Sequence, residues 1–354
     1  MTAMDVDAGV AVVNHIFESL RVEDSWSVRR ARGFRWLAWR LCQVVRASPP
    51  FEDAGHTLSR VQATTTVLRN TVAPVPSVGK ALLMLNREAL GSAWVFELET
   101  RELRLVLAMS VHGGTVAFRA SQLATFSHLQ IMEAESRAEA LATALDAEVA
   151  IASHPKSGYR KEPNGFALAP AWFQEESGAV SRFQSSDEME MVASMLADYG
   201  DAVYTDGHRA EGLACEVPFG ARDTSLVELV TSALHPWLGT GLLVLSRARL
   251  RTSWDDATSI AARLNALSLG DQSVLPGLGG WCAWPDGESW SLAHSHFLPN
   301  LMAQTGVARD AASSALLRMH LVDQLFHPDL GPRSAAAIVA ARRAAEDAPA
   351  VGLN

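Results

Sequence analysis

The chain has 354 residues, of which 48% are hydrophobic and 19% charged, a composition typical of a folded protein with room for about two domains. Its 30 basic and 39 acidic side chains leave a formal net charge of −9, which disfavours a protein that binds mainly to a nucleic-acid backbone. The longest apolar runs fall far short of the ~20 residues of a membrane-spanning helix, and Asp5 and Asp7 stand where a signal peptide would be basic. We therefore expect a cytoplasmic protein with no membrane partner. Its three widely separated cysteines exclude a disulfide framework.

Helical and strand patterns divide the chain into two halves joined by an irregular stretch. In the first half, apolar residues at helical spacing predict helices over 8–21, 77–91 and 136–149. Residues typical of strands, or apolar residues that alternate with polar ones, predict strands over 34–39, 41–47, 56–68, 94–98 and 103–109. In the second half the same patterns predict helices over 185–200, 253–270 and 307–326. They also predict strands over 213–219, 226–234, 241–248, 280–284 and 289–296.

Both halves show one order of elements: a helix, three strands, a helix, two strands and a helix. We therefore predict an α+β fold of two tandem domains, each an antiparallel sheet packed with helices. The first domain covers residues 1–152 and the second covers 183–330, with a linker at 153–182 and an Ala-rich tail at 331–354. No repeat of individual residues is evident, so the predicted duplication depends on the order of elements alone.

Motifs for catalysis or nucleotide binding are missing from the sequence. The chain has no G-x-S-x-G nucleophile motif. Gly239 and Gly241 lie in a strand-like run, and the glycine-rich stretch 276–280 precedes a strand, the reverse of a phosphate-binding loop. We therefore expect a protein that is not an enzyme and has no cofactor.

Histidines offer an alternative, a metal-dependent enzyme or regulator. His294 and His296 lie two residues apart on a predicted strand and so point the same way, and His320 or Asp323 on the last helix would supply a third ligand. Trp290 shares their strand face, however, which favours a packed surface. With no defined third ligand, we expect no metal site.

Tryptophan is unusually frequent, with 10 Trp against 3 Tyr. Core packing is one interpretation, because large rings bury much apolar surface. Trp36 and Trp39 cannot point the same way from a regular strand, however, and neither can Trp281 and Trp284. Some rings should therefore lie on a second sheet face that binds a protein or an extended peptide. The candidate partner-binding residues are Trp36, Trp39, Trp94, Phe96, Trp281, Trp284 and Trp290.

A third interpretation, nucleic-acid binding, would use a local group of arginines near the N-terminus. Its members are Arg29, Arg30, Arg32, Arg35 and Arg40. Because the whole chain is acidic, a solvated surface is the better interpretation, and we expect no nucleic-acid partner.

The second half resembles the type III secretion chaperones and their YbjN-like relatives in its order of elements. The third-strand region of uncharacterised bacterial members is similar to residues 235–250, HPWLGTGLLVLSRARL. Residues 253–269 (SWDDATSIAARLNALSL) and 279–287 (GGWCAWPDG) are similar to the segments that come next in those members, and residues 33–53 look like a more divergent strand pair. The resemblance implies a non-enzymatic module that binds an extended client segment. It also implies pairing, either as a homodimer or as an intramolecular pseudo-dimer of the two halves.

Overall fold

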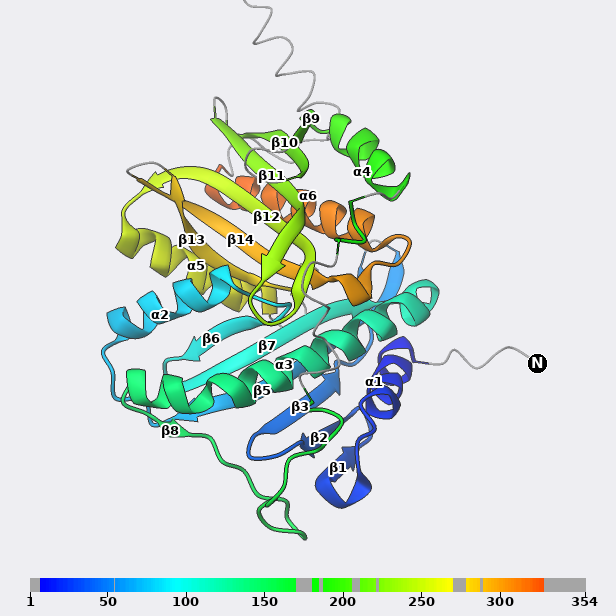
Figure 1. The fold of residues 1–354 in the computed structure, drawn as a ribbon, viewed down its shortest axis with the longest axis vertical. Helices are drawn as coiled ribbons and strands as arrows, with labels where there is room; N and C mark the ends of the chain where they lie inside the picture. Colours follow the sequence, from blue (N-terminus) through cyan, green and yellow to red (C-terminus); the bar gives the residue numbers. More distant parts are fainter. Residues whose placement is uncertain are drawn as a thin grey trace, which may run out of the picture. The chain divides into compact units, whose positions relative to one another are not determined.

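The computed structural model describes residues 7–53, 55–169, 180–184, 187–205, 211–220, 223–269, 278–286 and 289–327. Within these residues the protein is α+β, with two antiparallel sheets (Figure 1). The chain forms two compact units, and neither is continuous. Unit 1 comprises Met1–Gln174, Ser253–Ala283 and His294–His296, and unit 2 comprises Glu175–Thr252, Trp284–Ala293 and Phe297–Asn354. Residues 253–283 therefore belong to unit 1 although they fall in the expected second domain, and the expected tail 331–354 lies outside the described residues.

Unit 1 contains one sheet and four of the helices. The helices are α1 (Ala8–Ser19), α2 (Val75–Arg87), α3 (Val116–Ala144) and α5 (Trp254–Leu269). The strands are β1 (Ser27–Arg30), β2 (Gly33–Leu37), β3 (Cys42–Ala47), β4 (Phe51–Asp53), β5 (His56–Arg69), β6 (Ala93–Glu97), β7 (Glu102–Val111) and β8 (Glu148–Val149). The strand order is β1-β2-β3-β5-β7-β6, with β4 and β8 also paired to β5, so β6 forms one edge of the sheet.

The two faces of this sheet differ in what covers them. Figure 1 shows α1 and α3 against the sheet, and the rings of Phe17 on α1 and Phe34 on β2 pack edge-to-face with centroids 5.1 Å apart. The opposite face carries the C-terminal end of α5. There the Arg60 guanidinium donates to the carbonyl of Ser268, and Gln62 donates to the carbonyl of Leu269 at 3.1 Å. A buried cation at the end of a helix satisfies carbonyls that have no partner within the helix.

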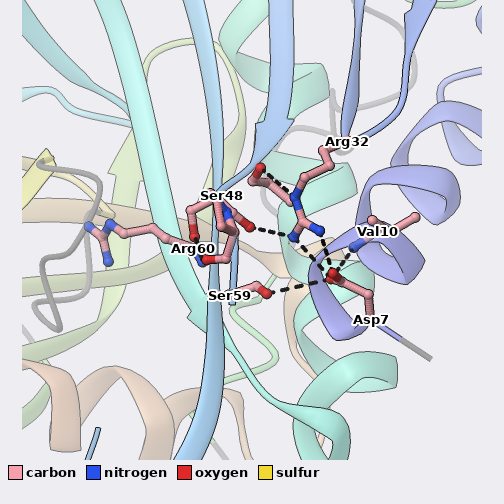
Figure 2. A network of polar contacts seen from close by, with 8 residues as sticks. Asp7, Val10, Arg32, Ser48, Ser59 and Arg60 are labelled. Atoms are coloured by element: carbon pink, nitrogen blue, oxygen red, sulfur yellow. Dashed lines mark hydrogen bonds and ion pairs between the residues drawn. The ribbon is translucent and has the colours of Figure 1, made fainter. Parts of the chain in front are cut away.

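A polar network fastens α1 to the sheet (Figure 2). The Asp7 carboxylate caps the helix by accepting from the Val10 amide at 3.1 Å, and it also accepts from both terminal nitrogens of Arg32. Arg32 donates in turn to the carbonyl of Ser48, whose hydroxyl accepts from the Arg60 amide at 2.9 Å. The Arg32 hydrogen bonds lower the pKa of Asp7 below its ordinary value.

The second sheet has the strand order β13-β14-β12-β11-β10-β9. Its strands are β9 (Asp201–Thr205), β10 (Gly212–Phe219), β11 (Asp223–His235), β12 (Gly239–Thr252), β13 (Gly280–Asp286) and β14 (Ser289–Pro299). Strands β9 to β12 belong to unit 2, as do α4 (Asp187–Ala197) and α6 (Val307–Phe326), whereas Gly280–Ala283 of β13 and His294–His296 of β14 are assigned to unit 1.

The two halves of the chain repeat one another in topology. Leaving aside the short β4 and β8, each half runs helix, four strands, helix, two strands, helix, and each sheet orders its strands first, second, third, fourth, sixth, fifth. The prediction of three strands before the middle helix was therefore one strand short in each half. The missing strands are β1, which lies in the basic connector, and β9.

A repeat of individual residues accompanies this topology. The side chain of Asn86 accepts from the Trp94 amide at 2.8 Å and donates to the Trp94 carbonyl at 3.1 Å. Asn265 makes the same pair of bonds to Trp281, at 2.9 and 3.2 Å. Both asparagines follow a leucine near the end of the middle helix of their half. The tryptophan follows eight residues later in the first half and sixteen later in the second, which conceals the repeat in the sequence.

Two predicted segments differ from the structure. Helix α3 begins at Val116 rather than at residue 136, and its buried face includes polar residues such as Gln130 and Glu133, which break the apolar pattern. Part of the expected linker 153–182 packs on unit 1. The carboxylate of Glu23 accepts from Arg160 at 2.7 Å and from Asn164 at 2.7 Å, while residues 170–179 lie outside the described part.

Candidate functional site

A cavity of about 680 Å³ lies in unit 1 between α2, β6 and α5. This volume is within the range of ~300–1,000 Å³ that is usual for ligand pockets. Most of the lining is apolar, and the lining residues include no histidine or cysteine. From α2, β6 and the residue after β6 they are Val75, Pro76, Val78, Gly79, Leu82, Leu83, Asn86, Trp94, Val95, Phe96, Glu97 and Leu98. From α5 and β13 they are Trp254, Asp255, Thr258, Ser259, Ala261, Ala262, Arg263, Asn265, Ala266 and Trp281.

Small residues where α2 and α5 meet allow the two helices to approach closely. A Cβ atom added at Gly79 on α2 would lie 2.6 Å from the Thr258 Cγ2 atom on α5, closer than van der Waals contact permits. Helix α5 begins with a local cap, in which the Ser253 hydroxyl accepts from the Asp256 amide at 3.2 Å. It then contributes alanines at 261, 262 and 266 to the lining, and these short side chains leave space beside β6.

Strand β6 presents a hydrogen-bonding edge to this cavity. The bonds of Asn86 to the amide and carbonyl of Trp94 show that these backbone groups point away from β7. In an antiparallel pair the outward-pointing residues alternate, so the amide and carbonyl of Phe96 point the same way. Asn86 thus occupies the place that a neighbouring strand would take at Trp94, and Phe96 offers the next pair of backbone groups.

The indole of Trp94 is hydrogen-bonded to a buried carboxyl group on α3. The Trp94 indole Nε1 donates to the Glu133 Oε1 atom at 3.0 Å, and Arg137 lies 3.6 Å from the same carboxyl group. The Glu133 side chain is 1% exposed, and its second oxygen has no hydrogen-bond partner among the described residues. Removal from water disfavours the charged form and raises the pKa of Glu133 to about 7.

Three of the seven predicted partner-binding residues meet at this cavity: Trp94, Phe96 and Trp281. Trp94 and Trp281 are completely buried, so they form the cavity wall and cannot act as protruding anchors, whereas Phe96 is half-buried.

The other four predicted residues lie elsewhere. Trp36 is buried in the core with its indole nitrogen 3.1 Å from the Glu23 carboxylate, which corrects its assignment to a binding surface. Trp39 is half-buried beneath the Arg40 guanidinium, and Trp284 and Trp290 are half-buried in unit 2. Within unit 1, neither Trp36 nor Trp39 is part of the cavity lining.

The histidines do not assemble a metal site within the described residues. His294 and His296 are both buried, with ring centroids 5.9 Å apart, and His294 packs edge-to-face on Trp281. His320 lies on α6 with its Nε2 atom 3.0 Å from the Gln324 side chain. In the described part of the chain, no three residues of the types that bind metals come together. The ligand set of the metal-dependent alternative is therefore not formed there.

Several cavity residues were not predicted from the sequence. Leu82 belongs to the apolar stripe of α2, which indicated packing without showing that one part of it faces a cavity. The sequence feature that could have indicated the cavity is the set of small residues inside the two helices, Gly79 in the middle of α2 and the alanines of α5. Small residues at such positions are typical of helices that approach each other closely. Trp254 is the first residue of α5, and nothing in the local sequence distinguishes it from an ordinary residue of a helix N-terminus.

Among the helices that the structure describes, none is both long and apolar enough to cross a membrane. Comparison with protein-family models, with curated proteins and with solved structures gave no significant match.

Proposed function

We propose that this protein is a non-enzymatic binding module that takes up an extended, apolar segment of a partner protein along β6. One observation carries the proposal: an apolar cavity runs beside a sheet edge whose outward backbone groups include those of Phe96. A peptide that adds a strand to such an edge gains backbone hydrogen bonds, and its alternate side chains enter the neighbouring pocket.

The lining residues of α2 and α5 determine which side chains of a bound segment the cavity can accept. The side chains of Leu82 and Phe96 and the alanines of α5 favour apolar groups, while Glu97, Asp255 and Arg263 provide a few charges in the lining. The expected ligand is therefore a segment with apolar residues at every second position.

The repeated topology supports a further part of the proposal. Two copies of one helix–sheet layout in one chain are what the resemblance to secretion chaperones and YbjN-like proteins implies for tandem, chaperone-like domains. We propose on this basis that the chain is a single-polypeptide counterpart of a chaperone homodimer and acts in the cytoplasm.

Peptide selection tests the binding proposal. Random peptides displayed on phage are selected against the full chain, and the enriched sequences are synthesised and measured by fluorescence anisotropy. We expect alternating apolar residues among them. We also expect binding to be lost when the peptide amides that face β6 are N-methylated, because methylation removes the donors that strand pairing needs.

Matched variants locate the site. Leu82→Asp places a charge in the lining of the cavity, whereas Met84→Asp places one on the same helix at an exposed residue outside the lining. Ala266→Glu and Leu267→Glu form a second pair on α5, since both residues are exposed and only Ala266 lines the cavity. Binding that is weakened equally within each pair, or peptides that tolerate N-methylation, would refute the proposal.

A further inference from the structure

The strands at the other end of the first sheet carry an unusual set of charges. β1, β2, β3 and β5 contain no aspartate or glutamate. They contain the arginines Arg29, Arg30, Arg35, Arg46, Arg60 and Arg69. In a chain with a net charge of −9, four adjacent strands without one acidic residue form a local region of the opposite sign.

Three of these six arginines, Arg29, Arg60 and Arg69, make contacts with other parts of unit 1. The Arg29 guanidinium lies 3.3 Å from the centroid of the Phe17 ring, on the side of the sheet that α1 covers. Arg60 is buried beneath the end of α5, and Arg69 lies 3.6 Å from the carboxylate of Glu102.

The strand register places Arg30, Arg35 and Arg46 together on the face opposite α1. Arg30 pairs with Gly33, which pairs with Arg46 on its other side, so the two arginines are two strand spacings, or about 10 Å, apart. Arg35 is two residues along β2 from Gly33 and therefore lies on the same face, diagonal to both. Gly33, which lies between Arg30 and Arg46, has no side chain to separate them. We call Arg30, Arg35 and Arg46 the arginine face.

The arginine face is accessible in unit 1. Arg30 and Arg46 are exposed and Arg35 is half-buried. The Arg46 guanidinium donates to the amide oxygen of Gln62 at 2.9 Å, which holds the side chain along the sheet. Arg30 and Arg35 form no ion pair with any residue in the described part of the chain.

We infer that the arginine face binds an acidic, extended polypeptide segment. Guanidinium groups bind carboxylates through paired hydrogen bonds, and a sheet face with arginines about 7–10 Å apart is comparable to the ~7 Å between alternate side chains on one face of an extended chain. This surface is distinct from the β6 cavity, and the inference does not depend on the proposed function.

A single-stranded nucleic acid fits this face less well. Such ligands depend on aromatic rings on which their bases stack, and the aromatic residues of β2, Phe34 and Trp36, lie on the opposite, buried face. The neighbours of the arginines on this face are instead the non-aromatic side chains Val28, Val44, Gln62 and Thr64.

Anisotropy with the full chain tests the inference. The probes are a fluorescein-labelled peptide of alternating Glu and Thr, the same peptide with Gln in place of Glu, and an oligouridine RNA of similar length. The acidic peptide should bind, the Gln peptide should not, and rising salt should weaken binding because the contacts are exposed ion pairs. The double variant Arg30→Gln/Arg35→Gln should weaken binding by about tenfold or more, and Arg→Lys at both positions should restore it only in part.

The control is Arg182→Gln/Arg309→Gln, which removes the same charge from two exposed arginines elsewhere in the chain. An equal loss of binding in this control, or equal binding of the Gln peptide, would overturn the inference. Tighter binding of the RNA that depends on Arg30 and Arg35 would overturn the assignment of an acidic polypeptide. Leu82→Asp should leave binding of the acidic peptide unchanged, so failure of this inference and failure of the cavity proposal are separately visible.

Discussion

Replacing Glu133 with glutamine should stabilise the protein, and the gain should depend on pH. Burial raises the pKa of Glu133 to about 7 from an ordinary value of 4.5, so the folded state holds the proton more tightly than the unfolded chain does. Below about pH 4.5 the carboxyl group is neutral in both states and costs nothing. As the pH rises to about 7, the unfolded chain loses the proton first and the free energy of unfolding falls.

The size of the effect depends on the two pKa values. At about 1.4 kcal/mol for each pKa unit, the difference between about 7 and 4.5 corresponds to about 3 kcal/mol, reached in full above pH 7. Glutamine is neutral at every pH and keeps an oxygen that can accept from the Trp94 indole, which donates to Glu133 at 3.0 Å. Glu133→Gln should therefore match the natural chain near about pH 4.5 and exceed its stability by about 3 kcal/mol near about pH 8.

Urea unfolding followed by circular dichroism across this pH range measures the difference directly. The control is Glu139→Gln, on the same helix, where the carboxylate is exposed and pairs with Arg40. It should give no comparable gain in stability near about pH 8, because it removes a carboxylate that is not buried. A Glu133→Gln variant whose difference from the natural chain is the same at every pH would refute the argument, because burial of an ionising group would then not be the cause.

Substitutions at three further sites, around Asp7, Asn86 and Gly79, test the packing of the helices. Asp7→Ala should lower the free energy of unfolding by about 1 kcal/mol through the lost helix cap. The natural chain should lose stability as the pH falls below about 3.8, because the folded state holds Asp7 in its charged form, and Asp7→Asn should abolish this loss. Thermal unfolding measures both effects. Asn86→Ala should cost about 2 kcal/mol or more in urea unfolding, because the amide and carbonyl of Trp94 lose their partner in a buried site; a neutral effect would show that water replaces it. Gly79→Ala should cost about 1–3 kcal/mol through overlap with Thr258, and Thr258→Ser, which removes the clashing methyl group, should recover most of the loss in the double variant.

The sequence predicted the fold where local patterns and burial agree. Strand β7 has the buried leucines Leu103, Leu105 and Leu107 at every second position, and α6 keeps one apolar stripe, so both were located closely. Helix α3 was placed too late because it buries polar groups that find partners only in three dimensions. Gln130, for example, donates to the Ala63 carbonyl and accepts from Thr65.

The candidate site could be predicted only in part. Trp94, Phe96 and Trp281 were selected as aromatic residues, and they do meet, but their cavity depends on contact between α2 and α5, which are far apart in sequence. Periodicity shows which face of a helix is buried but not against which element. Trp36 shows the same limit, since its buried indole is satisfied by Glu23, a residue outside any strand.

The duplication within one polypeptide has a consequence for how its surfaces evolve. In an assembly of two identical chains every mutation is copied to both, so the equivalent surfaces stay alike. Here the copies are encoded separately. β1, β2, β3 and β5 have no acidic residue, whereas their counterparts β9 to β12 carry Asp201, Glu216, Asp223 and Glu228. A substitution in one copy therefore leaves the other unchanged, and the two sheets differ in electrostatic character although they share one topology.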